Sequence, residues 1–344
     1  MIRKENKIGI VILFIVLISC STDQSQFPVL RGLYLGQNPP GDVPELFAPG
    51  IVSSVYLEHG SAVFTPDGKE VFWSREINLG REPRIIVIMH MKQENGVWSK
   101  PELAPFNFND AAYNHINSIS PDGKCLYYFT WSEKRGRKVW VVDKTENDWG
   151  DPHVIEKCLT GSEEDINEVH ETRSGNLYCT GPLASSPRGW GIVRTRFADG
   201  KYQEYESLGA DVNFNCDDPY PNHSPTVDPD ERFVIFVSRR PGGYGTQDLY
   251  ISYRQSDDTF GPAINLGHKI NTIGKGNSWP QLSPDGKYLF FVGYSHTQNE
   301  EDILRRKYSY DELIKREESI YNGLGNIYWV STSFIQDLKP DELK

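Results

Sequence analysis

Short runs of β-branched and aromatic residues recur along the chain, and each follows a turn of nearly constant sequence. The turn and its run occupy residues 65–73, 120–129, 228–236 and 283–292. Three of these copies begin with Ser or Thr followed by Pro-Asp-Gly-Lys, and residues 172–179 form a degenerate copy with Arg173 and Ser174 in place of Pro and Asp. Aligned on the prolines and on Arg173, the copies start 55, 52, 56 and 55 residues apart. Such a fixed period is typical of a repeat architecture.

Each copy predicts a β-hairpin. Pro-Asp-Gly is turn chemistry, because proline pre-sets φ, aspartate bonds its own backbone, and glycine accepts a positive φ. An apolar strand precedes the turn, a β-branched and aromatic strand follows it, and a third strand comes later. We expect these third strands at residues 84–91, 138–143, 191–197, 248–253 and 326–332. An outer strand is expected after Trp98, Trp149, Tyr202 or Phe260. Four antiparallel strands in about fifty residues are a propeller blade, so the sequence predicts an all-β fold, a single β-propeller.

The two ends of the repeat region predict how the ring closes. Residues 44–52 resemble an outer strand but have no blade of their own, and the last blade has little chain after its third strand. We therefore expect the N-terminal strand to complete the last blade, which removes free sheet edges. The prediction is a propeller over residues 44–332 with five four-stranded blades, and six blades are the alternative. The expected blades span residues 61–105, 114–158, 166–209, 222–267 and 277–332 together with 44–52.

The N-terminus resembles an export signal. Basic residues precede an apolar run from Ile8 to Ile18, which is too short to span a bilayer permanently. The run ends in Leu17-Ile18-Ser19-Cys20, which resembles a bacterial lipobox with Cys20 as the lipid attachment site; an ordinary signal peptide cut elsewhere is the alternative. The predicted segments are a signal peptide at 1–19, a tether at 20–43 and a C-terminal tail at 333–344. The mature chain is expected in the bacterial cell envelope, anchored by lipid to the outer membrane.

The composition indicates which kinds of molecule the protein is expected not to bind. The net charge is −11, which argues against a nucleic-acid partner. Cys125, Cys158, Cys179 and Cys216 show no metal-binding spacing, so no metal and no cofactor are expected. Cys125 and Cys179 are predicted to be small buried residues. One helix is predicted, from the capping box Ser309-Tyr310-Asp311-Glu312 to Tyr321, within an insertion in the last blade.

Equivalent positions before each innermost strand predict a ring at the mouth of the central channel. Counting back from each turn, these positions hold asparagine, histidine, glutamate or tryptophan. The candidate ligand-binding residues are His59, Asn114, His115, Asn167, Glu168, Asn222, His223, Asn277 and Trp279. The alternative is structural, because asparagine at the start of a strand often bonds its own backbone and shapes a turn.

Arginines in the loops between second and third strands reach the same face. Arg75 and Arg239 are candidate ligand-binding residues, and Arg135 and Arg188 hold similar positions. Arginines on an acidic protein favour a ligand with a carboxylate, sulfate or phosphate. The alternative is that they are solvated and paired with neighbouring acids such as Glu76 and Glu133.

Catalytic motifs are sparse. The sequence has no Gly-x-Ser-x-Gly and no His-Glu-x-x-His. Glycosidases use two carboxylates across a sugar, and the spacing selects no pair from the mouth candidates. These carboxylates are Glu58, Asp165, Glu168, Asp217 and Asp218.

The hairpins resemble the WD40-like repeats of TolB-type β-propellers, also called PD40 repeats. Residues 239–250, Arg-Arg-Pro-Gly-Gly-Tyr-Gly-Thr-Gln-Asp-Leu-Tyr, are similar to a stretch in such repeats of outer-membrane lipoproteins and proteins related to peptidoglycan anchoring. The resemblance covers roughly residues 44–332 and implies a fold rather than an activity, because propellers of this kind include enzymes, scaffolds and receptors. No catalytic residue follows from it.

These observations leave three hypotheses for function. The first is a binding or scaffold lipoprotein of the envelope, with a protein, peptide or glycan at the mouth. The second is a glycan-active hydrolase or lyase on a five-bladed ring. The third is a structural component of an envelope assembly that binds through blade edges.

Overall fold

The computed structural model describes most of the chain. The described residues are 27–77, 84–109, 111–134, 136–146, 148–155, 166–183, 189–214, 218, 220–271, 276–296 and 307–344. The signal-peptide prediction and Cys20 lie outside this range, and so do Arg135, Arg188, Asp165 and Asp217. Cys158 and Cys216 also lie outside it.

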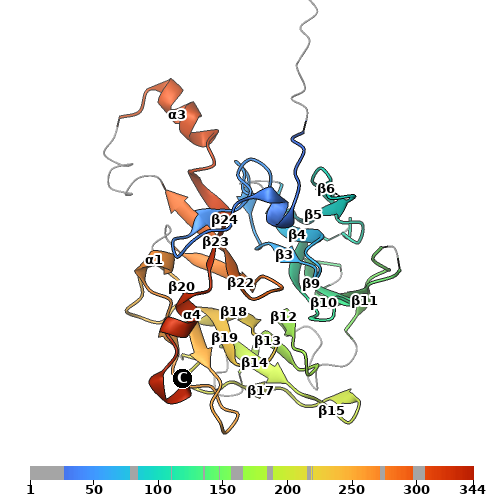
Figure 1. Ribbon diagram of the computed structural model, residues 1–344, viewed down its shortest axis with the longest axis vertical. Coiled ribbons are helices and arrows are strands. Elements are labelled where there is room, and N and C mark those ends of the chain that lie inside the picture. The colour runs from blue at the N-terminus through green and yellow to red at the C-terminus, as the bar shows by residue number, and fades with distance from the viewer. Residues whose placement is uncertain are drawn as a thin grey trace, which may run out of the picture.

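The five repeat copies lie in five groups of antiparallel strands (Figure 1). The first group contains β2 (Leu57–Glu58), β3 (Val63–Phe64), β4 (Glu70–Glu76), β5 (Ile86–Glu94), β6 (Val97–Trp98) and β7 (Glu102–Leu103). The second contains β8 (Tyr113–Ile119), β9 (Cys125–Ser132), β10 (Gly136–Asp143) and β11 (His153–Val154). These two groups are joined into one ten-stranded sheet by the parallel pairing of Ile86 with Tyr113.

The remaining groups are separate four-stranded sheets. The third is β12 (Asn167–Glu171), β13 (Leu177–Pro182), β14 (Trp190–Thr195) and β17 (Glu206–Ser207), with a small hairpin of β15 (Phe197–Ala198) and β16 (Lys201–Tyr202). The fourth is β18 (Asn222–Val227), β19 (Phe233–Ser238), β20 (Asp248–Tyr253) and β21 (Ile264–Asn265). The last has the order β1 (Glu45–Leu46), β24 (Asn322–Ser331), β23 (Tyr288–His296) and β22 (Asn277–Leu282).

The predicted hairpins are confirmed, and the second copy shows why the turn forms. Ser120 Oγ donates to the Asp122 carboxylate at 2.7 Å, and that carboxylate accepts from the Lys124 N–H at 3.0 Å. Gly123 follows with φ +76°, a conformation that suits glycine because it has no Cβ. The turn therefore satisfies its own backbone and sets the register of β8 against β9.

The predicted pairing of the N-terminal strand with the last sheet is also confirmed. Glu45 and Leu46 lie opposite Trp329 and Tyr328, and the Phe47 N–H donates to the Ile327 carbonyl at 2.8 Å. Part of the predicted tether differs from expectation, because η1 (Leu33–Gly36) packs against the sheets. Its Tyr34 is buried in the apolar cluster of the first and last sheets.

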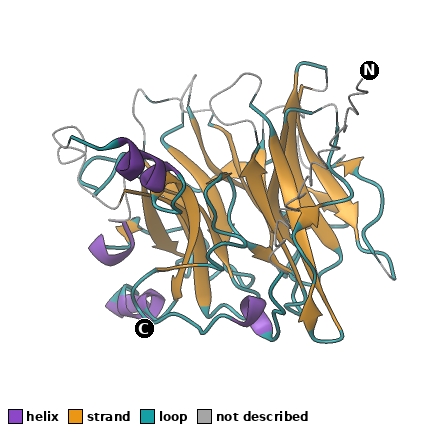
Figure 2. Cartoon of the chain, turned by 90° about the horizontal axis from the view of Figure 1, so that it is seen from above, coloured by secondary structure: helices purple, strands orange, loops and turns teal. Residues whose placement is uncertain are grey.

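Apolar clusters join consecutive groups of strands. Leu126 packs with Ile88 of the preceding group, and Val193 packs with Val141. Phe236 packs with Ile192, and Phe291 packs with Ile251. A further cluster joins Phe290 and Trp329 of the last sheet to Trp73 of the first. Figure 2 shows the sheets standing side by side. The apolar faces of each group of strands are therefore buried against the neighbouring group.

The helices are short. They are α1 (His268–Asn271), α3 (Tyr310–Glu317), α4 (Phe334–Asp337) and η2 (Asp341–Leu343). The predicted capping box is confirmed at Ser309 and Glu312, but α3 ends at Glu317 and not at Tyr321 as predicted. β24 also begins earlier than predicted, at Asn322. α3 projects from the sheets (Figure 1). None of the helices in the described part of the chain is long and apolar enough to cross a membrane.

Candidate functional site

Three innermost strands carry a bulge at the same place. Glu168, Ser224 and Trp279 have φ of +57°, +51° and +49°, and the registers of β12, β18 and β22 shift around them. A positive φ in a residue other than glycine costs roughly 1–3 kcal/mol and persists only where the surroundings impose it. Because such strain gathers at functional sites, the bulges mark the start of the innermost strands as the candidate site.

Aromatic and imidazole rings from three groups of strands meet beside these bulges. The ring of His59 lies 4.5 Å from that of Trp279 and 5.6 Å from that of His115, between centroids. The Tyr113 hydroxyl lies 3.2 Å from His59 Nδ1. The His115 Nε2–H donates to the His59 carbonyl at 2.9 Å. Residues that the sequence placed at one mouth are therefore in contact here.

Glu168 joins this cluster to the fourth sheet. Its carboxylate accepts from Thr180 Oγ1 at 2.6 Å, from Ser224 Oγ at 2.6 Å and from the Ser224 N–H at 2.7 Å. Burial opposes ionisation, but the neighbouring His223 and the bonds from Ser224 and Thr180 outweigh it, so the pKa of Glu168 is lowered. Glu168 is thus a fixed anion at the start of the innermost strands, the part of the molecule that we call the rim.

Burial favours the neutral form of the histidines around this anion. Burial lowers the pKa of His115 and of His223, and burial lowers the pKa of His59 well below its usual range. His170 lies deeper, and burial lowers its pKa to about 4. Neutral imidazoles offer one donor and one acceptor each, which suits hydroxyl groups of a ligand.

The space enclosed between the innermost strands is small. A cavity of about 20 Å³ lies among Ser61, Glu168, His170 and Trp279, enough for a single water molecule. Ser61 Oγ is buried there without a hydrogen-bond partner among the described residues. A larger ligand must therefore bind on the open side of the rim, where some predicted residues are partly exposed. These are Asn167, Glu168, His223 and Trp279, with Tyr113 beside them.

Three of the predicted asparagines are buried and take the structural role that was the alternative. The Asn114 side chain bonds both the N–H and the carbonyl of Phe108. Asn222 Nδ2 donates to the Phe214 carbonyl at 2.8 Å. Asn277 Nδ2 donates to Asn271 Oδ1 at 3.2 Å. Each fixes the connection that leads into its own innermost strand.

The two predicted arginines differ in exposure. Arg75 is mostly buried and donates to Glu58 at 2.8 Å and to the Val52 carbonyl at 3.0 Å, so it ties the N-terminal segment to β4. Burial raises the pKa of Glu58 to about 7, although Arg75 acts in the opposite direction. Arg239 lies at the rim and donates to Asp218 at 2.7 Å. Within the described ranges, no group of three or more His, Cys, Asp or Glu residues is arranged to hold a metal ion.

The two predicted buried cysteines are free thiols in the structure. Cys179 is buried, as expected, and Cys125 is half-buried with its Sγ 3.6 Å from Asp143.

A cluster at the rim was missed by sequence reasoning. Arg137 at the start of β10 donates to the Tyr220 hydroxyl at 3.1 Å, and its guanidinium lies 5.9 Å from the Trp190 ring. The Trp190 and Tyr220 rings are 5.4 Å apart. The three residues come from the second, third and fourth groups of strands. The only sequence signal was that Arg137 and Trp190 begin third strands, where the loops reach the mouth.

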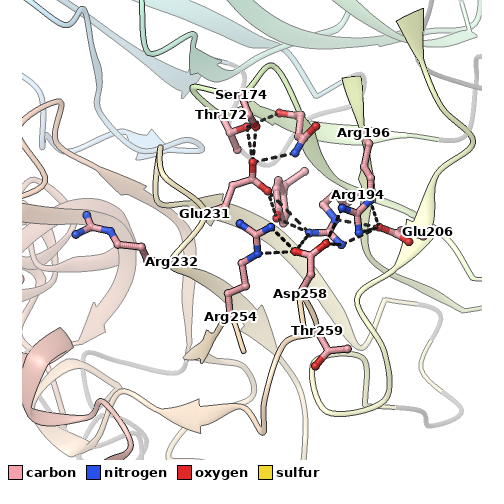
Figure 3. Close-up of polar contacts among 12 residues, drawn as sticks. Thr172, Ser174, Arg194, Arg196, Glu206, Glu231, Arg232, Arg254, Asp258 and Thr259 are labelled. Atoms are coloured by element: carbon pink, nitrogen blue, oxygen red, sulfur yellow. Dashed lines mark hydrogen bonds and ion pairs between the residues drawn. The ribbon is translucent and has the colours of Figure 1, made fainter. Parts of the chain in front are cut away.

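A second missed cluster lies at the opposite ends of the innermost strands, near the repeat turns (Figure 3). Glu231 replaces the repeat glycine, with φ +59°. Its carboxylate accepts from the Thr172, Ser174 and Tyr178 hydroxyls at 3.1, 2.5 and 2.8 Å. Ser174 replaces the aspartate that the turn otherwise uses, so the acid missing from the third copy is supplied by the fourth.

Arg194 completes this second cluster. It is buried and donates to Glu206 at 2.8 Å and to Asp258 at 3.1 Å, and it lies 3.9 Å from Glu231. Arg196 and Arg254 also pair with Asp258. Arg194, Arg196 and Arg254 all pair with acids of the cluster, whereas Arg232, which Figure 3 also draws, pairs with Asp228 instead. We interpret the cluster as a link between the third and fourth sheets.

Comparisons with known proteins agree with the fold. A search of protein-family models finds no match, and a search of curated proteins finds none either. Among solved structures, an α-L-arabinofuranosidase from Lactobacillus brevis is similar at 11% identity, with a TM-score of 0.50 over 82% of this chain and 92% of that chain.

Two further structures are less similar. The catalytic domain of an α-L-arabinofuranosidase from Coprinopsis cinerea has 11% identity and a TM-score of 0.45 over 86% of this chain and 98% of that chain. TolB from Acinetobacter baumannii has 17% identity and a TM-score of 0.42 over 68% of this chain, which spans only 48% of that TolB. At these identities the likeness concerns the fold alone. The protein is a mostly β chain with the fold of a β-propeller.

Proposed function

We propose that the chain is a five-bladed, exported propeller that acts as a binding module of the bacterial cell envelope, with its ligand on the axial rim. The observation that supports the proposal is that five residues, one from each repeat copy, lie near one another: His59, His115, Glu168, His223 and Trp279. Neutral imidazoles, a partly exposed indole and a fixed carboxylate suit a ligand rich in hydroxyl groups. A glycan is the ligand class that these groups favour over a peptide or protein.

The envelope location is part of the same proposal. It is supported by the basic and apolar leader and by the sequence before Cys20, whose side chain would carry the lipid. The proposed anchor faces the outer membrane, and the propeller follows on a short tether.

A hydrolase on the same rim is the alternative. It needs two carboxylates across a sugar, and the candidates differ in availability. Glu58 is buried against Arg75, Asp218 is paired with Arg239, and Glu168 is held by Thr180 and Ser224. Because these carboxylates already have partners, we favour binding.

The test is a glycan and peptide array probed with the mature protein, followed by the double variant His223→Ala, Trp279→Ala. We expect the variant to lose glycan binding while its melting temperature stays within a few degrees of the wild type. Phe197→Ala, on the exposed β15 hairpin, is the matched control and should bind normally. Unchanged binding by the folded double variant would refute the rim as the site. Cleavage of an array glycan by the wild type, lost in Glu168→Gln, would replace the binding module with the hydrolase.

A further inference from the structure

Arg137 is a cation at the rim, and among the described residues it has no anionic partner. Its side chain is exposed, and its contacts in the described part of the chain are the Tyr220 hydroxyl at 3.1 Å and the Trp190 ring at 5.9 Å. The chain as a whole has a net charge of −11, and most other arginines at the site are paired with acids. A guanidinium that is held in place but not neutralised is a receptor for an anion.

The groups that hold Arg137 are themselves fixed. The Tyr220 N–H donates to Asp218 at 2.7 Å, and Asp218 accepts from Arg239 at 2.7 Å. Trp190 lies opposite Pro182 in the β13–β14 ladder. Arg137 is therefore in contact with two aromatic side chains whose backbones are held in place, which lowers the entropy lost when a ligand binds.

Exposed aromatic surface lies on the same face of the sheet as Arg137. Trp131 of β9 is opposite Arg137 in the β9–β10 register, so both side chains are on one face of the sheet. Trp131 is 44% exposed, so its ring is accessible to a ligand. An aromatic ring beside a guanidinium matches a ligand that carries an apolar ring face and a carboxylate together.

We infer that Arg137, Trp131, Trp190 and Tyr220 form an acid-sugar subsite, which binds the carboxylate of a hexuronate residue in a glycan. The guanidinium takes the carboxylate, and an indole takes the C–H face of the sugar. A peptide that adds to an exposed strand edge is held by main-chain bonds, whereas this surface offers side-chain rings and a guanidinium. This inference rests on the proposed glycan-binding function and names the class of sugar.

The experiment is calorimetric titration of the mature protein with a tetragalacturonate and with the matched neutral galactose tetrasaccharide, at 50 mM and 300 mM NaCl. A charge-assisted, bidentate contact predicts roughly 10- to 100-fold tighter binding of the acidic sugar, weakened by salt. Arg137→Gln should remove this preference, and Arg137→Lys should keep only part of it because lysine lacks the planar fork. Arg31→Gln, an exposed arginine of the N-terminal segment, is the control.

The outcomes separate this inference from the proposed function. Equal affinity for both sugars, unchanged in a folded Arg137→Gln, would overturn the acid-sugar subsite and leave glycan binding intact. Failure of both sugars and of every glycan on the array would overturn both proposals. Displacement of the sugar by a carboxylate-ended peptide whose tighter binding depends on Arg137 would overturn the glycan class.

Discussion

Glu231 of the fourth repeat copy supplies the acid that the third copy lacks at Ser174. This predicts that Ser174→Asp changes the free energy of unfolding in opposite directions with and without Glu231. Glu231 is buried, and its carboxylate accepts hydrogen bonds from Thr172, Ser174, Asn176 and Tyr178. Breaking a buried charged network costs about 3–5 kcal/mol, so Glu231→Ala should lower the free energy of unfolding by that amount. Glu231→Gly should cost about 1 kcal/mol less, because glycine removes the strain of φ +59°.

The effect of Ser174→Asp on stability should differ between the wild type and Glu231→Gly. In the wild type the new carboxylate would lie against Glu231, since Ser174 Oγ is 2.5 Å from its Oε1. Two adjacent like charges, of which Glu231 is buried, should cost about 2 kcal/mol or more. In Glu231→Gly the same substitution restores the turn of the other copies, in which Thr65 Oγ1 donates to Asp67 at 2.7 Å. There it should be stabilising by about 1 kcal/mol.

The assay is equilibrium urea unfolding of the four proteins in this cycle, followed by tryptophan fluorescence. The double-mutant cycle should give a coupling energy of about 3 kcal/mol with a change of sign for Ser174→Asp. If the effects of Ser174→Asp and Glu231→Gly on the free energy of unfolding are additive, Glu231 does not replace the missing aspartate of the third copy. The pH dependence is a second check, because the pKa of Glu231 is lowered by its hydrogen bonds despite burial. The stability it contributes is present above its unfolded pKa of about 4.3 and is lost as the pH falls through the folded value.

Three further predictions concern the anchor, the closure and the connections between sheets. Cys20→Ala should release the protein into the soluble fraction without fatty-acid label, and a labelled, membrane-bound variant would contradict the lipid anchor. Deletion of residues 44–52 removes the β1–β24 pairing and should lower the melting temperature sharply; unchanged melting would contradict the closing role. Asn271→Ala should cost about 2–3 kcal/mol in urea unfolding, because Asn271 bonds both the N–H and the carbonyl of Leu249. A cost below about 0.5 kcal/mol would contradict this role.

The fold was predictable where local chemistry determined it. The turn at Ser120–Lys124 closes through its own side chains, so its position follows from the sequence and its period gives the repeat. The pairing of Leu46 with Tyr328 followed because an unpaired outer strand stood at one end and an incomplete sheet at the other. Tyr34 escaped prediction because its burial depends on Phe64, Tyr288 and Trp329, which are distant in the sequence.

The site was predictable in position but not in detail. Counting back from the repeat turns placed His59, His115 and Trp279 together, because they hold three successive positions at the start of the innermost strands, and those strand starts lie close together. The backbone at Trp279 was not foreseen, since a bulge depends on the neighbouring strand and leaves no fixed residue type. The role of Arg137 depends on Tyr220, 83 residues away, and a contact between non-equivalent positions has no signature in a repeat.

Some of the predicted ligand-binding residues are buried and form hydrogen bonds within the protein. Asn114 and Asn277 were candidates for ligand contact, yet their amides are used by the protein's own loops. Arg75 was also a candidate for ligand contact, but its guanidinium donates hydrogen bonds to Glu58 and to the Val52 carbonyl. Sequence position gave the face on which these residues lie but not whether the folded chain leaves them free.

A crystal structure of the mature protein with a bound hexuronate oligosaccharide would test the axial rim most directly. We predict that the sugar lies over Trp279 and His223, with a carboxylate within hydrogen-bond distance of the Arg137 guanidinium. A sugar bound on an outer strand, with the rim unchanged, would contradict the proposed site.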